Sequence, residues 1–208
     1  MQDKIQDLLE LRQLYNAAIR EVSTKLEILD EEFRVRFNHN PIHHIDCRLK
    51  SPQSIIDKLN RKMCEISIES IKNNITDIAG IRVVSNYIDD IYTISELLLK
   101  QDDITLLRKR DYIANPKENG YRSLHLVIQI PIFLSDCKEF IPLEVQIRTI
   151  AMDCWASLEH QLIYKSPDPL PDTLREQLKE CSDAVSDIDM KFQNIYFARL
   201  SEINASHS

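Results

Sequence analysis

The segment RKRDYIANPKENGYRSLH, from Arg108 to His125, separates two strand-like runs of the chain. It carries five lysine and arginine side chains, one histidine, two tyrosines and one glycine, a composition that suits a loop built to hold a polyphosphate. Gly120 is one of only two glycines in 208 residues. We therefore predict that the backbone at Gly120 turns with positive φ or approaches a ligand closely.

Strands and helices of ordinary length are predicted on both sides of this loop. Runs rich in apolar and β-branched residues predict strands over residues 80–86, 104–110, 124–130 and 143–148. Helices are predicted over residues 89–100 and 149–164, and a hairpin-like connection is expected around Pro131 to Pro142. This mixture predicts an α+β fold of mixed α/β type, in which helices pack on a mixed sheet.

A long amphipathic helix is predicted near the N-terminus, because apolar residues recur at alternating steps of four and three from Tyr15 to Phe33. We expect it to end before Pro41. Ser51 and Pro52 then form a favourable N-cap and first-turn pair for a second helix. Its expected apolar stripe consists of Ile55, Ile56, Leu59 and Met63.

Another long helix is predicted after the prolines at positions 167, 169 and 171. Its apolar residues keep a strict four-three spacing and form a heptad seam of Leu174, Leu178, Cys181, Val185, Ile188, Phe192 and Ile195. Such a seam either packs within the molecule or joins two copies of the chain. The length of this helix, relative to a domain of this size, favours a homo-oligomer.

The composition predicts one ordinary hydrophobic core, because 43% of the 208 residues are hydrophobic and nothing resembles a linker between two cores. We expect a central domain over residues 41–166. Helical extensions are expected over residues 1–40 and 167–208.

Charge and cysteine content restrict the classes of partner and compartment. A net charge of -7 argues against coating nucleic acid through overall charge, so anionic partners must meet local clusters such as the five cations between Arg48 and Lys62. Five cysteines without CxxC spacing favour reduced thiols, and hence the cytoplasm, over a disulfide framework or a zinc site. No apolar run approaches the roughly 18 residues of a membrane span, so no membrane partner is expected.

Two carboxylates are candidates for metal chemistry. In PLEVQIR, strand alternation places Glu144, Gln146 and Arg148 on one face of the sheet. Asp77 lies just before the strand predicted over residues 80–86. Magnesium bound with nucleotide phosphates usually takes one or two protein carboxylates, so Asp77 and Glu144 form a sufficient set. The pair predicts a metal-nucleotide enzyme rather than a solvated sheet face.

The loop supplies side chains for a nucleotide. Tyr121 can stack on a base, and Arg122 and Lys117 can contact phosphate. His125 can donate a hydrogen bond to a phosphate or ribose oxygen. We therefore expect these four residues to act together.

Four segments in order resemble the synthetase domain of RelA/SpoT-type enzymes, and the short length and flanking helices resemble the small alarmone synthetase branch. They read RLKSPQSIIDKLNRK, ITDIAGIRVV, RKRDYIANPKENGYRSLHLVI and PLEVQIRTIAMDCWASLEHQLIYK, from Arg48 to Lys165. The resemblance implies a nucleotidyltransferase-like mixed β-sheet and transfer of the β,γ-pyrophosphate of ATP to the 3′-hydroxyl of GDP or GTP. The chain has no His-Asp dipeptide, so the hydrolase half of bifunctional relatives is not expected.

The resemblance also implies roles for particular residues on the ATP side. Arg48 and Arg82 would sandwich the adenine ring. The expected contacts to the ATP phosphates are Ser54, Lys58 and Arg61. Asp77 and Glu144 would bind Mg²⁺, and Glu144 would also take the proton of the attacking hydroxyl.

On the acceptor side, the resemblance implies that guanine stacks on Tyr121. Lys117 and His125 would lie near the acceptor phosphates, with Arg122 as a further phosphate contact. Gln146 would lie near the transferred group. The same resemblance implies a homo-oligomer, specifically a tetramer.

Two other functions stay open at this point. The same transfer reaction could use an adenine nucleotide or the 3′ end of tRNA, because a stacking tyrosine accepts any base. Alternatively, the basic clusters could bind nucleotides or single-stranded RNA without turnover. The two carboxylates argue against a pure binder, since such a protein gains little from acidic groups beside phosphate.

Overall fold

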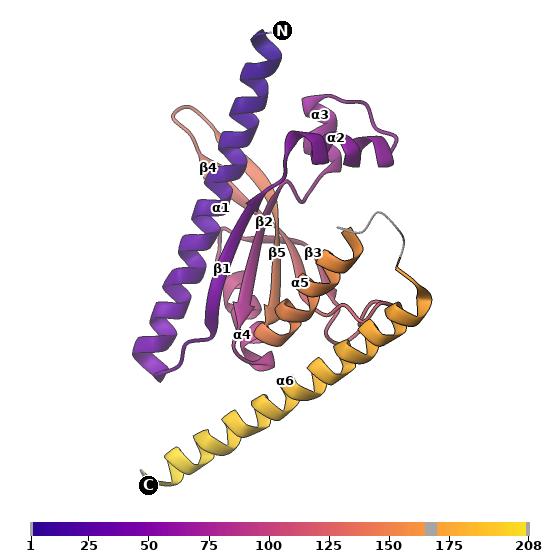
Figure 1. Cartoon of the computed structure of the whole chain (residues 1–208). Coiled ribbons are helices and arrows are strands. Elements are labelled where there is room, and N and C mark those ends of the chain that lie inside the picture. Colours follow the sequence, from indigo (N-terminus) through magenta and orange to yellow (C-terminus); the bar gives the residue numbers. More distant parts are fainter. Residues whose placement is uncertain (1, 165–169, 207–208) are drawn as a thin grey trace.

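A five-stranded mixed sheet forms the centre of the protein, in the order β1-β2-β5-β4-β3 (Figure 1). The computed structural model describes residues 2–164 and 170–206. The strands are β1 (Ile42–Leu49), β2 (Ala79–Ser85), β3 (Thr105–Asp111), β4 (Leu124–Phe133) and β5 (Lys138–Thr149). The helices are α1 (Gln2–Phe37), α2 (Pro52–Arg61), α3 (Ile68–Asn74), α4 (Ile88–Leu99), α5 (Ile150–Tyr164) and α6 (Asp172–Ser206).

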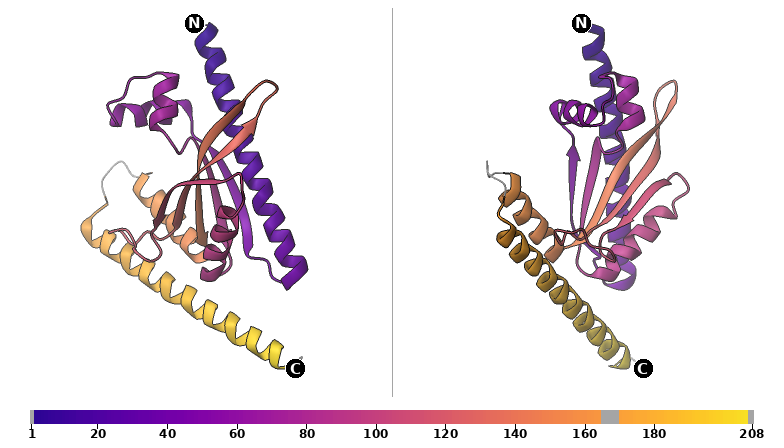
Figure 2. Two further views of the ribbon diagram at one scale, coloured as in Figure 1. Left: turned by 180° about the vertical axis from the view of Figure 1, so that it is seen from behind. Right: turned by 90° about the vertical axis from the view of Figure 1, so that its right-hand side faces the viewer.

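The central pair of the sheet is parallel, and the other neighbours are antiparallel. β2 pairs with β5 in parallel, so that Gly80 lies opposite Glu144. β1 pairs with β2, β3 with β4, and β4 with β5 in antiparallel fashion. The right-hand view of Figure 2 shows α1 and α4 on one side of the sheet, and α5 with α6 on the other.

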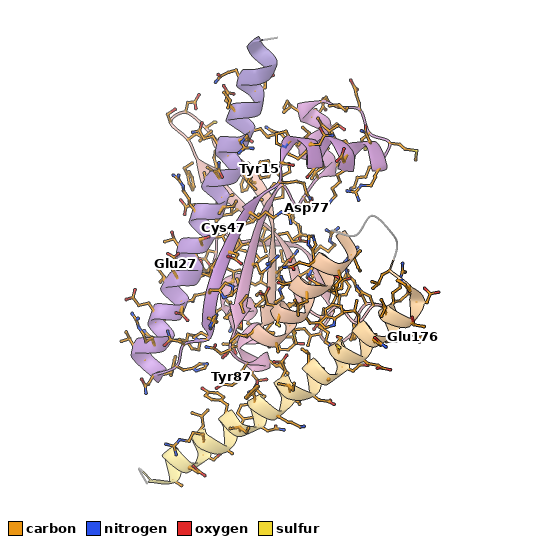
Figure 3. All side chains as sticks on the ribbon, in the orientation of Figure 1. Tyr15, Glu27, Cys47, Asp77, Tyr87 and Glu176 are labelled. Carbon is orange, nitrogen blue, oxygen red and sulfur yellow. The ribbon has the colours of Figure 1, made fainter. Side chains whose placement is uncertain are left out.

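Strand alternation divides β5 between the core and the opposite face of the sheet. Leu143, Val145 and Ile147 are fully buried in the core with residues of α1 and α4. Glu144 and Gln146 face the opposite side, as predicted from the period of two. The α1 helix contributes Tyr15 to the same core, and Figure 3 labels this side chain.

Two elements were not predicted, namely β1 and α3. The β1 sequence IHHIDCRL has too few alternating apolar residues to predict a strand. It forms a strand because it pairs along β2, from Ile42 opposite Ser85 to Leu49 opposite Ala79. The α3 helix is only 7 residues long and begins at the Ser67 N-cap. A helix this short has too few residues for an apolar period to be recognised in the sequence.

The β4–β5 hairpin is tighter than predicted. Both strands run through the expected connection, because Pro131 pairs with Phe140 and Pro142 pairs with Gln129. At Pro131, β4 no longer pairs with β3, and at Pro142, β5 does not yet pair with β2. Each strand has a neighbour on one side only at its proline, which is where a sheet accommodates the missing N–H.

The α2 helix confirms its predicted start and its predicted apolar stripe, apart from Met63. The Ser51 side chain accepts a hydrogen bond from the Ser54 backbone N–H at 3.2 Å, as expected of an N-cap. Ile55 and Leu59 are buried. Met63 lies beyond the helix end, has a φ of 55° and is 94% exposed, so its inclusion in the stripe was wrong.

The α6 helix buries three polar side chains against the domain. Ser182, Asp189 and Gln193 are 2%, 5% and 3% exposed, whereas Ile188 and Phe192 of the heptad seam are 44% and 55% exposed. Within the described part of the chain, these two seam residues are therefore not covered by other elements. The predicted domain boundary between residues 166 and 167, and the prolines at positions 167 and 169, lie outside the described residues.

Candidate active site

A charged cleft lies on the sheet face opposite the α1 and α4 core, where β1, β2 and β5 run side by side. The register places Arg48 opposite Gly80, and Gly80 opposite Glu144. Arg82 follows two residues after Gly80, so a side chain at position 80 would project into the same space. The glycine keeps the floor of the cleft open. The charged and polar residues that line it include Arg48, Lys50, Asp77, Arg82, Glu144 and Gln146.

Asp77 lines the cleft just before β2. It contacts Lys58 of α2, and Figure 3 labels it at the end of the sheet that faces this helix. Lys50 Nζ and Lys58 Nζ donate hydrogen bonds to Asp77 Oδ2 at 2.7 Å and 2.6 Å. Asp77 Oδ1 is buried and has no hydrogen-bond partner among the described residues. Burial alone would raise the pKa of Asp77, but the hydrogen bonds and charges of Lys50 and Lys58 outweigh burial and lower it.

Glu144 lies in the cleft beside Gln146 and His125. Gln146 Nε2 donates a hydrogen bond to Glu144 Oε2 at 2.7 Å, and His125 Nδ1 lies 3.5 Å from Glu144 Oε1. Burial would raise the pKa of Glu144, but hydrogen bonds from His125 and Gln146 outweigh it and lower that pKa. The charge of Asp77 acts in the opposite direction, which places the two carboxylates within electrostatic reach of each other.

An aromatic cluster adjoins Glu144 through His125. Tyr121 Oη and His125 Nε2 share a hydrogen bond of 2.9 Å, and burial raises the pKa of Tyr121, so its phenol stays neutral. Lys117 Nζ lies 4.7 Å from the ring centroid of Tyr121 and 4.8 Å from that of Tyr112. Tyr112 belongs to this cluster and was not predicted as a site residue, although the sequence places it in the basic loop.

The Gly120 prediction is confirmed. Its φ is +91°, a conformation that residues with a side chain rarely adopt. The Gly120 N–H donates to the Lys117 carbonyl at 2.8 Å, which closes the turn before Tyr121.

A second group of charges surrounds Asp153 at the start of α5. Arg148 is 3% exposed, and its Nη2 lies 2.8 Å from Asp153 Oδ1. Burial lowers the pKa of Arg148. Arg82 Nη1 lies 3.7 Å from the same oxygen and 3.9 Å from Asp46 Oδ2. Arg148 was predicted to share a sheet face with Glu144 and Gln146, and its guanidinium pairs with Asp153 at the start of α5.

Seven predicted site residues are not part of the cleft lining. Lys58 donates a hydrogen bond to Asp77, and Lys117, Tyr121 and His125 form the aromatic cluster beside Glu144. The other three are Ser54, Arg61 and Arg122. Ser54 Oγ lies 2.9 Å from Ser51 Oγ at the start of α2, and Arg61 is exposed at the end of that helix. Arg122 donates hydrogen bonds to the Ile113 carbonyl at 3.3 Å and to Asp183 of α6 at 3.2 Å. Their predicted phosphate contacts therefore stay predictions.

The sheet and its charged cleft define a nucleotide-handling α+β domain, and comparison with known proteins identifies the family. A family model described as a region found in RelA / SpoT proteins matches residues 47–168. GTP pyrophosphokinase YwaC from Bacillus subtilis is 43% identical over 182 residues, which span 88% of this chain and 87% of that protein. The chain belongs to the RelA/SpoT family.

Solved structures confirm the predicted fold. Small alarmone synthetase 2 from Bacillus subtilis has a TM-score of 0.84 and 40% identity, covering 92% of this chain and 99% of that one. Small alarmone synthetase 1 from the same organism, bound to its product pppGpp, has a TM-score of 0.81 and 35% identity, covering 88% and 93%. In the described part of this chain, no helix is both long and apolar enough to cross a membrane.

The lowered pKa of Asp77 predicts a pH-dependent contribution to stability. This contribution is fully present above the unfolded-state pKa of about 4 and is lost as pH falls through the lower folded-state value. At pH 7, Asp77→Asn should lower the free energy of unfolding by about 1 to 2 kcal/mol, because Lys50 and Lys58 lose a charged acceptor. Urea titrations should show a smaller difference in the free energy of unfolding between wild type and Asp77→Asn at pH 3.5 than at pH 7.

Asp57→Asn is the control for that experiment. Asp57 is exposed on α2, where its Oδ1 accepts a hydrogen bond from Gln53. Its replacement should change stability by no more than about 0.5 kcal/mol. A difference between wild type and Asp77→Asn that stayed constant with pH would contradict the electrostatic origin.

Proposed function

We propose that this protein transfers the β,γ-pyrophosphate of ATP to the 3′-hydroxyl of GDP or GTP, which yields ppGpp or pppGpp and releases AMP. The observation that carries the proposal is a single cleft with two ionised carboxylates, flanked by lysine and arginine on one side and by an aromatic cluster on the other. Membership of the RelA/SpoT family supports the same reaction. The small alarmone synthetase 1 structure holds pppGpp as that enzyme's product.

ATP fits the β1 and β2 side of the cleft. Arg48 and Arg82 come from neighbouring strands and both line it. Their planar guanidinium groups suit the two faces of an adenine ring. Lys50 and Lys58 lie next to Asp77, where their charges would offset those of the phosphates. Ser54 and Arg61 are further phosphate contacts in this proposal.

Asp77 and Glu144 fit a Mg²⁺ ion. A buried carboxylate oxygen without a partner, Asp77 Oδ1, is available as a ligand, and Glu144 is ionised because its pKa is lowered. Over residues 2–164 and 170–206, no group of three or more metal-ligating side chains is found. Phosphate oxygens and water would thus complete the coordination, as is usual for Mg²⁺ with nucleotides. When bound, Mg²⁺ would neutralise charge on the phosphates.

The acceptor nucleotide fits the Tyr121 side of the cleft. Guanine would stack on the Tyr121 ring, and Lys117, Arg122 and His125 would contact the acceptor phosphates. Tyr121 is hydrogen-bonded to His125, and His125 contacts Glu144. These contacts would fix the position of the stacked base relative to Glu144, which accepts the proton of the reacting hydroxyl. This arrangement holds the acceptor in position, which is the main contribution of a protein to phosphoryl transfer.

The chain's own residues then perform one proton transfer. Glu144 takes the proton from the 3′-hydroxyl as its oxygen attacks the β-phosphorus of ATP. The bond between the β-phosphorus and the α,β-bridging oxygen breaks, and AMP leaves. Gln146 donates a hydrogen bond that orients the Glu144 carboxylate, and it would lie near the transferred group.

One incubation tests the function. The purified protein is mixed with labelled ATP and, separately, GDP, GTP, ADP or tRNA, and the products are separated by thin-layer chromatography. We expect AMP and a guanosine tetra- or pentaphosphate, and their loss when EDTA removes Mg²⁺. Product with ADP or tRNA alone would favour the other acceptors. Absence of AMP release with every acceptor would favour a non-catalytic binder.

Replacement of Glu144 should affect turnover more than binding. For Glu144→Gln, we expect kcat to fall by about 10² to 10⁴-fold, the usual contribution of a general base. Nucleotide affinity, measured by calorimetry, should change by less than about threefold, because the amide keeps the shape of the side chain. Glu139→Gln is the matched control, since Glu139 lies on the same strand outside the cleft. Near-normal turnover by Glu144→Gln would contradict the assigned role.

We also propose a homo-oligomer, with a tetramer expected from the family, that uses the exposed seam of α6. Replacing Ile188 and Phe192 together by arginine should lower the mass seen in sedimentation velocity, because charged groups oppose burial of that face. Asp187→Arg, at an exposed position outside the seam, should leave the mass unchanged. An unaltered mass for the double variant would contradict this interface.

The proposed reaction belongs in the cytoplasm, where its nucleotides occur. The five cysteines are free thiols, which agrees with that compartment. Binding of single-stranded RNA stays a prediction.

A further inference from the structure

The polar face of α6 contacts the loop that carries the predicted guanine-binding residues. We call residues 112–123 the acceptor loop. Ser182 Oγ donates a short hydrogen bond to the Gly120 carbonyl, and both groups are buried. Asp183 Oδ1 accepts a hydrogen bond from Arg122 Nη2 at 3.2 Å. Two consecutive residues of α6 therefore hold two residues of the loop.

The contact at Gly120 is close enough to exclude a side chain. A Cβ added at Gly120 would lie 2.7 Å from Ser182 Cβ and 3.0 Å from Ser182 Oγ. Glycine is thus required twice at this position, once by its positive φ and once by the approach of α6. The loop can therefore adopt this conformation beside α6 only with glycine at position 120.

The hydrogen bond from Ser182 controls the peptide unit that joins Gly120 to Tyr121. A peptide unit is planar, so an anchored Gly120 carbonyl also fixes the plane of the Tyr121 nitrogen. The Tyr121 carbonyl in turn accepts a hydrogen bond from the Lys117 N–H at 3.1 Å. Ser182 therefore acts on the backbone of Tyr121 directly, and Tyr121 carries the ring that meets His125.

We propose that Ser182 and Asp183 are positioning residues for the acceptor nucleotide. They hold the acceptor loop in the conformation that presents the Tyr121 ring beside Glu144. The inference rests on the proposed function, because it assigns an acceptor to that ring. It deepens this function by adding a helix outside the catalytic cleft to the residues that determine acceptor affinity.

Contacts distant from the loop hold α6 on the domain. Gln193 Oε1 accepts a hydrogen bond from the Asp89 backbone N–H at 3.0 Å. Tyr196 stacks on Tyr87, with ring centroids 4.3 Å apart, and Figure 3 shows Tyr87 at the base of the sheet beside α6. Because these contacts remain when Ser182 is altered, α6 should stay in place while the loop loses its anchor.

The only tryptophan of the chain reports this docking. Trp155 of α5 donates its indole N–H to the Leu178 carbonyl of α6 at 2.8 Å. Its fluorescence therefore distinguishes a displaced helix from a loosened loop. The outer edge of the loop is also held by α5, because Asn119 Nδ2 donates to Glu159 at 2.9 Å. Removal of Ser182 Oγ should thus weaken the acceptor site without abolishing it.

The test compares Ser182→Ala and Asp183→Ala with Gln193→Ala, which removes a contact of α6 that does not touch the loop. For the first two variants, we expect the KM for GDP to rise by about three- to tenfold, the usual effect of one lost hydrogen bond. The KM for ATP should stay within about twofold and Trp155 emission should not change. Gln193→Ala should leave the KM for GDP within about twofold.

Three results would overturn the inference. They are an unchanged KM for GDP in both loop-facing variants, an equal rise in Gln193→Ala, and a shift of Trp155 emission in Ser182→Ala that shows displacement of α6. Wild-type protein that forms no product from ATP and GDP would instead refute the proposed function. In that case calorimetric affinity for GDP, compared among the same variants, still decides whether Ser182 and Asp183 position the loop.

Discussion

The parallel pairing of β2 with β5 is the constraint on which the cleft depends. Its register sets Gly80 opposite Glu144, so the residue without a side chain lies beside the acidic one. A shift by one residue would turn the polar positions of β5 into the core and its apolar positions into the cleft. Burial of Leu143, Val145 and Ile147 opposes that shift. The hydrophobic core thus determines where the chemistry can occur.

The charged side chains of the cleft offset one another within the protein itself. Asp77 and Glu144 repel each other, since the charge of Asp77 acts to raise the pKa of Glu144. Lys50 and Lys58 offset this repulsion at Asp77, and His125 and Gln146 stabilise the ionised form of Glu144. The site therefore keeps both carboxylates charged at neutral pH. Arrival of phosphates would let the lysines exchange one anionic partner for another, which requires little rearrangement of the protein.

Local patterns predicted the elements that have their own apolar period, such as β2, α4 and the inward face of β5. They did not predict β1, because a strand with several polar residues forms only when a neighbour supplies its hydrogen bonds. Among the candidate site residues, the sequence motifs singled out Asp77 and Glu144, and both line the same cleft. The orientation of Arg122 toward α6 could not be predicted, because Asp183 lies 61 residues away along the chain.

The α6 helix contacts the acceptor loop with one face and presents the proposed oligomer interface on the opposite face. Its buried polar face contacts the acceptor loop and the end of β5, where Thr149 Oγ1 donates to Asp189 at 2.6 Å. Its opposite face carries Ile188 and Phe192, whose exposure to water is unfavourable. A partner copy covering that face would hold α6 more firmly, and the loop anchored to α6 would lose freedom with it.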